Sequence, residues 1–114
     1  MVFNLFENMR LANWNIEEMT GYKPLTTLYT DFSIADKFGE NAIIDTYQKA
    51  FNELKDNYKY LTELVMVLNW KIWEHNETNK DYARLYNNLW EELSIYAEKN
   101  LKNEELNYYY RTID

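Results

Sequence analysis

Apolar residues recur at helical spacing along the second half of the chain, and this pattern predicts most of the fold. From about Asn41 to Asp56 the apolar positions follow i, i+4, i+7, i+8 and i+11, which is one face of an amphipathic helix. The next segment, Tyr58 to His75, is apolar around most of its circumference, as is typical of a central helix or of one that carries an interface. We therefore predict two consecutive helices, the second of them central to the core. The stripe of this second helix consists of Leu61, Leu64, Val65, Leu68 and Ile72.

Two more helices are predicted after a polar turn. Thr78 and Asp81 have the spacing of a capping box, in which the hydroxyl accepts a hydrogen bond from a backbone N–H. The i, i+3, i+4, i+7 pattern then continues to about Lys99. A short last helix should begin at Asn103, because asparagine is a favoured N-cap residue. The residues that we expect it to dock are Leu106 and either Tyr109 or Tyr110.

The first forty residues carry a weaker pattern. The segment from Asn13 to Thr20 predicts a short helix. The single proline disfavours a helical residue before it, so we expect Tyr22 to Tyr29 to form an extended strap across the bundle. Thr30 or Ser33 would then cap a helix that Gly39 ends, since a left-handed glycine commonly terminates helices.

These elements predict the fold class. Two glycines and one proline in 114 residues argue against a β-rich fold, because hairpins and sandwich turns need both residue types. We expect an all-α protein, a small helical bundle of four to six helices with an extended N-terminal strap. It should be a single domain over residues 1–114, with an irregular part at 1–39 and a helical core at 40–114.

Composition limits the cellular compartments and the classes of partner that we expect for this protein. The chain has no cysteine, which excludes disulfides, thiol nucleophiles and cysteine zinc sites. Its formal charge of −7 argues against direct binding of nucleic acid, whose phosphates need basic residues. The longest apolar run, Leu64 to Leu68, is far shorter than a membrane span, and Met1 to Arg10 lacks the pattern of a secretory signal. We therefore expect a cytoplasmic location.

The sequence offers little catalytic chemistry. The only histidine, His75, lies near a predicted helix end where the dipole favours a cation, and Glu74 and Glu77 beside it have the pattern of surface carboxylates. Glu63 shares its face with Lys71, which indicates an exposed stripe; a buried, functional Glu63 is the alternative. No glutamate precedes a histidine by three residues, as helical di-iron sites require, and phosphate-binding glycine loops are absent. We expect no enzymatic activity, no metal and no cofactor.

Aromatic and acidic residues are the features of the sequence that indicate a binding function. Tyrosine and tryptophan dominate binding hot spots, and the chain has eleven of the first and four of the second. The alternative is a tyrosine-rich core with its hydroxyls at the rim. Acidic residues are spread along the sequence, although a folded surface can still gather them against a basic partner. Our candidate protein-binding residues are Glu91, Glu92, Glu104, Glu105, Trp73 and Tyr109.

Several stretches resemble a family of small uncharacterised proteins carried by phages, plasmids and integrative elements of gut and low-GC bacteria. The resemblance covers about Asn13 to Asp114. The stretches are TGYKPLTT (Thr20 to Thr27), DFSIADKFG (Asp31 to Gly39), YLTELVMVLNWKIWEHNE (Tyr60 to Glu77), LYNNLWEEL (Leu85 to Leu93) and YYYRTID (Tyr108 to Asp114). They contain no recognised catalytic or ligand pattern, so no functional residue is carried over.

The resemblance implies a function by context. Small acidic proteins on mobile elements are often similar to anti-defence inhibitors, including anti-CRISPR proteins, which occupy the DNA channel of a host nuclease. We therefore expect a mobile-element accessory protein that acts by binding another protein. The most specific form of this hypothesis is that it inhibits a host defence nuclease by binding its basic nucleic-acid-binding surface. The alternative is a structural or oligomerisation module of a phage or conjugative element. A small-ligand-binding helical bundle is a third, weaker hypothesis.

Overall fold

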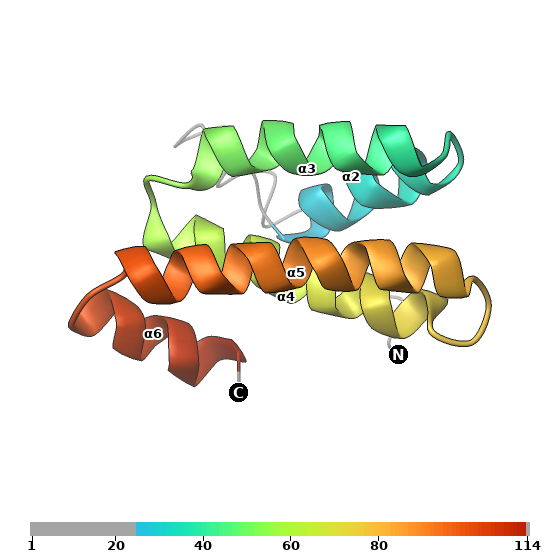
Figure 1. Ribbon diagram of the computed structural model, residues 1–114. Helices are drawn as coiled ribbons and strands as arrows, with labels where there is room; N and C mark the ends of the chain where they lie inside the picture. The colour runs from blue at the N-terminus through green and yellow to red at the C-terminus, as the bar shows by residue number, and fades with distance from the viewer. Residues whose placement is uncertain (1–24, 114) are drawn as a thin grey trace, which may run out of the picture.

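The computed structural model describes residues 25–113, which form five α-helices and no strand (Figure 1). The helices are α2 (Leu25–Asp36), α3 (Glu40–Leu54), α4 (Tyr58–His75), α5 (Lys80–Asn100) and α6 (Glu104–Ile113). The predicted all-α bundle is confirmed for this part of the chain, and α4 has the predicted bounds.

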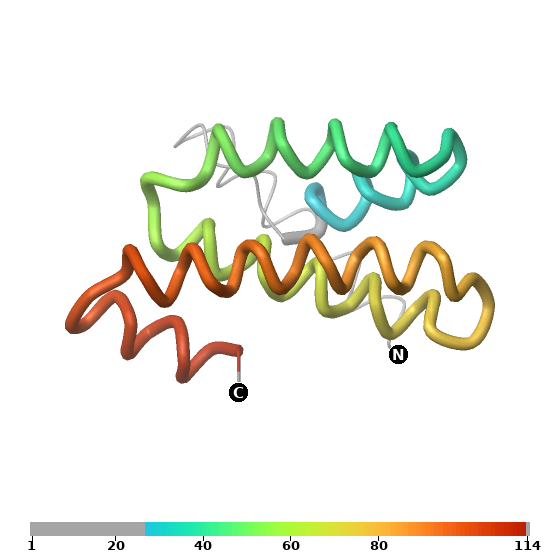
Figure 2. Tube along the Cα trace, viewed as in Figure 1, coloured from blue at the N-terminus to red at the C-terminus, as the bar shows by residue number. Residues whose placement is uncertain are grey.

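The helices form three layers, and the antiparallel pair α4 and α5 is the middle one (Figures 1 and 2). The hairpin of α2 and α3 covers one side of this pair, and α6 folds back along the other side. Helix α4 contacts α2, α3, α5 and α6, which explains why its sequence is apolar around most of its circumference. The prediction that α4 is central to the core is therefore confirmed.

The core is built from aliphatic and aromatic side chains of all five described helices. Leu68 of α4 is 0% exposed, and Phe32 of α2 packs edge-on against Tyr86 of α5 with ring centroids 5.7 Å apart. Edge-to-face contacts of this kind add to the stabilisation that burial itself provides. The other fully buried apolar side chains include Ile43, Leu61, Leu64, Val67, Leu93 and Tyr109.

Asparagine side chains cap the two central helices. The Asn57 side chain accepts hydrogen bonds from backbone N–H groups of the first turn of α4. Asn79 caps α5 in the same way, because its extended backbone lets its Oδ1 accept from the N–H of Tyr82 at 3.1 Å. The prediction that Thr78 caps this helix is wrong, since its hydroxyl lies 3.4 Å from the carbonyl oxygen of Glu74 and belongs to the end of α4.

The structure also corrects the predicted strap. Helix α2 begins at Leu25, so Tyr29 is helical rather than extended, and neither Thr30 nor Ser33 begins the helix. The physical reason is that a proline restricts the residue before it and not those that follow. Gly39 does occupy the turn after α2, with φ of 112°, a region that favours glycine. The predicted helix from Asn13 to Thr20 lies outside the described residues.

Helices α2 to α6 include none that is both long enough and apolar enough to cross a lipid bilayer.

Candidate functional site

A buried polar cluster joins α2, α4 and α5, and Lys71 lies at its centre. The Lys71 side chain is 0% exposed, and its Nζ lies 2.7 Å from Oδ2 of Asp36 and 2.6 Å from Oε2 of Glu74. The same ammonium donates to the Ser33 hydroxyl at 3.2 Å and lies 4.9 Å from the centre of the Tyr29 ring. A lysine is almost never fully buried unless it is paired, and these contacts supply the pairing.

The Asp36 carboxylate is the other hub of the cluster. The Tyr86 hydroxyl donates to its Oδ1 at 2.5 Å, and Nε2 of His75 lies 2.9 Å from its Oδ2. The Tyr82 hydroxyl donates to the backbone carbonyl of the same residue at 3.2 Å. The His75 ring is stacked on Tyr86, with an interplanar angle of 4°. Asp36 therefore ties the end of α2 to both central helices.

The electrostatics of the cluster favour a charged lysine and neutral tyrosines. Burial alone would lower the pKa of Lys71, but its hydrogen bonds and charge attraction to Asp36 and Glu74 outweigh burial and raise that pKa. Burial, followed by the neighbouring carboxylate of Asp36, raises the pKa of Tyr86. The amine is therefore protonated at neutral pH and is unsuited to act as a nucleophile.

Sequence reasoning missed this cluster. The prediction that Lys71 belongs to an exposed stripe is wrong, because Lys71 is fully buried. Glu74 is a surface carboxylate as predicted, with its side chain 41% exposed, and it also accepts a hydrogen bond from Tyr29 at 3.0 Å. Glu63, which was expected on the same exposed stripe, is partly buried. The available signal was the i, i+3, i+4 spacing of Lys71, Glu74 and His75, which places all three on one face of α4.

The cluster resembles a cation site whose cation is a lysine. Asp36, Glu74 and His75 each offer a ligand atom, and these atoms lie within 4.8 Å of one another. The ammonium of Lys71 contacts both carboxylates, so a metal ion placed between them would meet a fixed positive charge. The arrangement supports a structural role for this cluster in holding α2 on the bundle.

We expect that removing metal ions does not change the stability of the protein. Because Lys71 already neutralises the carboxylates of Asp36 and Glu74, thermal melts with and without EDTA should superimpose. Elemental analysis of the purified protein should find no stoichiometric metal. A melting temperature that falls on chelation would contradict this prediction.

A second feature is an open groove between α4 and α5 beyond the end of α6, which we call the tryptophan groove. It has a volume of about 700 Å³. Within the described part of the chain its lining residues, none of them charged, are Val65, Met66, Asn69, Trp70, Trp73, Trp90, Thr112 and Ile113. Trp73 is 78% exposed and Trp70 is 45% exposed. Large apolar side chains that gather at one exposed groove mark an interaction surface.

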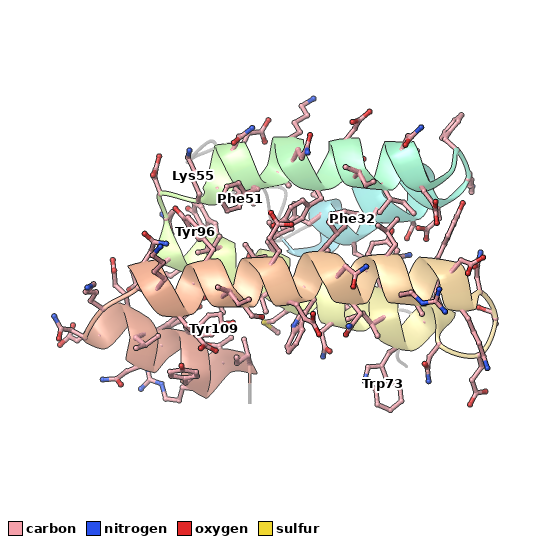
Figure 3. All side chains as sticks on the ribbon, in the orientation of Figure 1. Phe32, Phe51, Lys55, Trp73, Tyr96 and Tyr109 are labelled. Carbon is pink, nitrogen blue, oxygen red and sulfur yellow. The ribbon has the colours of Figure 1, made fainter. Side chains whose placement is uncertain are left out.

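The groove lies beside the last described turn of α6. Helix α6 has 10 residues and α4 has 18, and at 1.5 Å per residue α6 spans about half the length of α4. Its beginning packs against the start of α4, where the rings of Tyr58 and Tyr108 meet edge to face. Its last residue, Ile113, ends at the groove, and Trp73 projects away from the bundle beyond it (Figure 3).

The two aromatic candidates have opposite environments. Trp73 is exposed, as predicted. The expectation that Tyr109 is exposed is wrong, because its side chain is 0% exposed and belongs to the core. Spacing does not separate the two tyrosines, because Tyr109 at i+3 and Tyr110 at i+4 both lie near the face of Leu106. The packing of α6 buries Tyr109 and leaves Tyr110 40% exposed. Of the two tyrosines that the last helix was expected to dock into the core, Tyr109 is therefore the one that the structure buries.

The four acidic candidates are exposed but are distributed over two helices. Glu92 faces α3, and Glu91 accepts a hydrogen bond from the Asn87 side chain at 3.3 Å. Glu104 and Glu105 lie in the first turn of α6, where the helix dipole favours negative charge. Their binding role remains a prediction, and the structure spreads them over the surface.

Comparisons with protein-family models, with curated proteins and with solved structures found no match for this chain.

Proposed function

We propose that this protein acts without catalysis, by binding a basic protein partner through the tryptophan groove and the acidic surface around the bundle. The observation that carries the proposal is the exposure of Trp73 beside Trp70 at an open, uncharged groove. Tryptophan supplies a large, rigid contact area, and tryptophan side chains are the most enriched in binding hot spots.

The charge of the chain supports a basic partner. The formal charge is −7, and Glu91, Glu92, Glu104 and Glu105 are all exposed. Opposite charges accelerate association and help to exclude wrong partners. More specifically, we propose that the partner is a host defence nuclease and that this protein inhibits it by covering the basic surface where nucleic acid binds.

Affinity capture with a pair of matched variants tests the groove. We expect Trp73→Ala to lower recovery of a specific host protein by tenfold or more, because truncating a tryptophan hot spot costs about 2 kcal/mol or more. Ile95→Ala is the control, because Ile95 is 68% exposed on α5 and is outside the groove. Equal recovery of the partner by both variants and by the wild type would contradict the proposal.

The acidic surface is tested by kinetics with the captured partner. Changing Glu91, Glu92, Glu104 and Glu105 together to lysine should slow association and flatten its dependence on salt, because exposed charges act mainly on the on-rate. Trp73→Ala should instead raise the off-rate. For the nuclease form of the proposal, the wild-type protein should protect DNA from the captured partner, and Trp73→Ala should not.

A structural or oligomerisation module is the second candidate. The same exposed tryptophans favour it, because two copies could bury them against each other. Sedimentation over a range of protein concentrations separates the two candidates. Self-association that Trp73→Ala abolishes, with no host protein captured, would favour the oligomerisation module.

A further inference from the structure

A second hollow lies on another face of the molecule, between α3 and α5. It has a volume of about 400 Å³, and its walls include the aromatic residues Tyr47 and Phe51 from α3 and Glu92 from α5. The rings of Tyr47 and Phe51 are nearly parallel, with an interplanar angle of 21° and centroids 6.1 Å apart. The Phe51 ring also meets the Tyr96 ring edge to face at 4.8 Å, in the seam between the two helices (Figure 3).

Among the described residues that line this hollow, Glu92 is the one with a charged side chain. Glu92 is exposed, and within residues 25–113 it makes no hydrogen bond or ion pair. Its carboxylate lies near enough to Tyr47 to raise the pKa of that hydroxyl further, after the larger effect of burial. A carboxylate at an aromatic wall would lose its hydration if an apolar group entered the hollow, so a cation is the better occupant.

The aromatic wall already attracts a cation from within the chain. Nζ of Lys55 lies 5.9 Å from the centre of the Phe51 ring, within the range of a cation–π contact. This lysine is the C-cap residue of α3, one turn beyond Phe51, and is not among the described residues that line the hollow. Tyr47 is only 4% exposed, so within residues 25–113 the hollow offers the partly buried Phe51 ring and the Glu92 carboxylate together.

We propose that this hollow binds an arginine side chain, which the partner of the proposed function would supply. A guanidinium group is planar, so it can stack on an aromatic ring while two of its N–H groups donate to one carboxylate. Lysine lacks this flat face and the paired donors. Arginine also suits a basic partner, so the inference rests on the proposed function and adds the chemistry of one contact.

The hollow can be tested without the partner, with N-acetyl-arginine methylamide as the probe. Titration into the full-length protein, followed by NMR, should shift the resonances of Tyr47, Phe51 and Glu92. Glu92→Gln should weaken this binding about tenfold or more, because the charge-assisted hydrogen bonds are lost while the shape is kept. The neutral probe N-acetyl-citrulline methylamide should bind the wild-type protein no more tightly than the arginine probe binds Glu92→Gln.

The control is Glu98→Gln, because Glu98 is an exposed carboxylate of the same helix, does not line the hollow and is not one of the acidic residues assigned to partner binding. It should leave arginine binding unchanged. Equal binding of the arginine and citrulline probes, equal affinity of Glu92→Gln and wild type, or shifts that map to another face would each overturn the arginine site. Far-UV circular dichroism checks that both variants are folded.

The captured partner separates failure of this site from failure of the proposed function. Weaker partner binding by Glu92→Gln, with Glu98→Gln unchanged, supports an arginine of the partner in the hollow. If Trp73→Ala lowers partner binding and Glu92→Gln leaves it unchanged, the tryptophan groove stands and the arginine site is overturned. If Glu92→Gln lowers partner binding and Trp73→Ala does not, the arginine site stands and the groove fails.

Discussion

Replacing Asp36 by alanine is expected to lower the free energy of unfolding by about 3–5 kcal/mol, which is a large share of the total for a domain of this size. The substitution removes one of the two carboxylates that contact the fully buried ammonium of Lys71, and it leaves Tyr86 and His75 without their common acceptor. Breaking a buried ion pair costs this much because Lys71 stays shielded from water and keeps only the partly exposed Glu74 as a partner. Urea denaturation of the variant and the wild type measures the difference.

A control and a double variant make the test of Asp36 specific. Asp45→Ala should change stability by less than about 0.5 kcal/mol, because Asp45 is exposed on α3. Asp36→Leu combined with Lys71→Met should be more stable than Asp36→Ala, because replacing a whole buried pair by apolar groups removes the uncompensated charge. A loss below about 1 kcal/mol in Asp36→Ala would show that the cluster does not hold α2 on the bundle.

Replacing Leu68 by alanine is expected to cost about 2–5 kcal/mol. Leu68 is 0% exposed at the middle of α4, which contacts the other four described helices. The truncation loses the burial of the removed carbons and leaves a cavity that the surrounding helices cannot fully close. The free energy of unfolding from urea denaturation, followed by far-UV circular dichroism, checks this value.

Ile95→Ala provides the matched comparison for Leu68. Ile95 is 68% exposed on α5, so losing its side chain removes little buried surface and should change stability by less than about 0.5 kcal/mol. If Leu68→Ala also costs less than about 1 kcal/mol, α4 is not the centre of the core.

The positions of α3, α4, α5 and α6 followed from local pattern, whereas the start of α2 did not. Helix α4 has the bounds that the sequence predicts because its limits are set by neighbouring residues: Asn57 caps its first turn, and polar residues follow His75. Helices α3 and α5 differ from their predicted bounds by one or two residues at each end. Boundaries are harder to predict than the helices themselves, because the competing caps Thr78 and Asn79 are adjacent and only backbone conformation decides between them.

The environments of single side chains were harder to predict. Lys71 is buried because Asp36, from a helix 35 residues earlier in the chain, meets it at 2.7 Å. Periodicity along α4 records that Lys71 shares a face with Glu74 and His75, but it contains no information about what lies opposite. Periodicity is equally uninformative about Tyr109 and Tyr110. The packing of α6 on α4 decides which of the two is buried.

By itself, the sequence determined the all-α class, the central helix α4, the acidic charge and the absence of thiol chemistry, because these depend on composition and on contacts between residues three or four positions apart. Only the tertiary structure decided where the exposed surfaces lie. The tryptophan groove lies where α4, α5 and the last described turn of α6 meet, and the hollow beside Glu92 lies between α3 and α5. Both features depend on how these helices pack against one another, and that packing joins segments far apart in the chain.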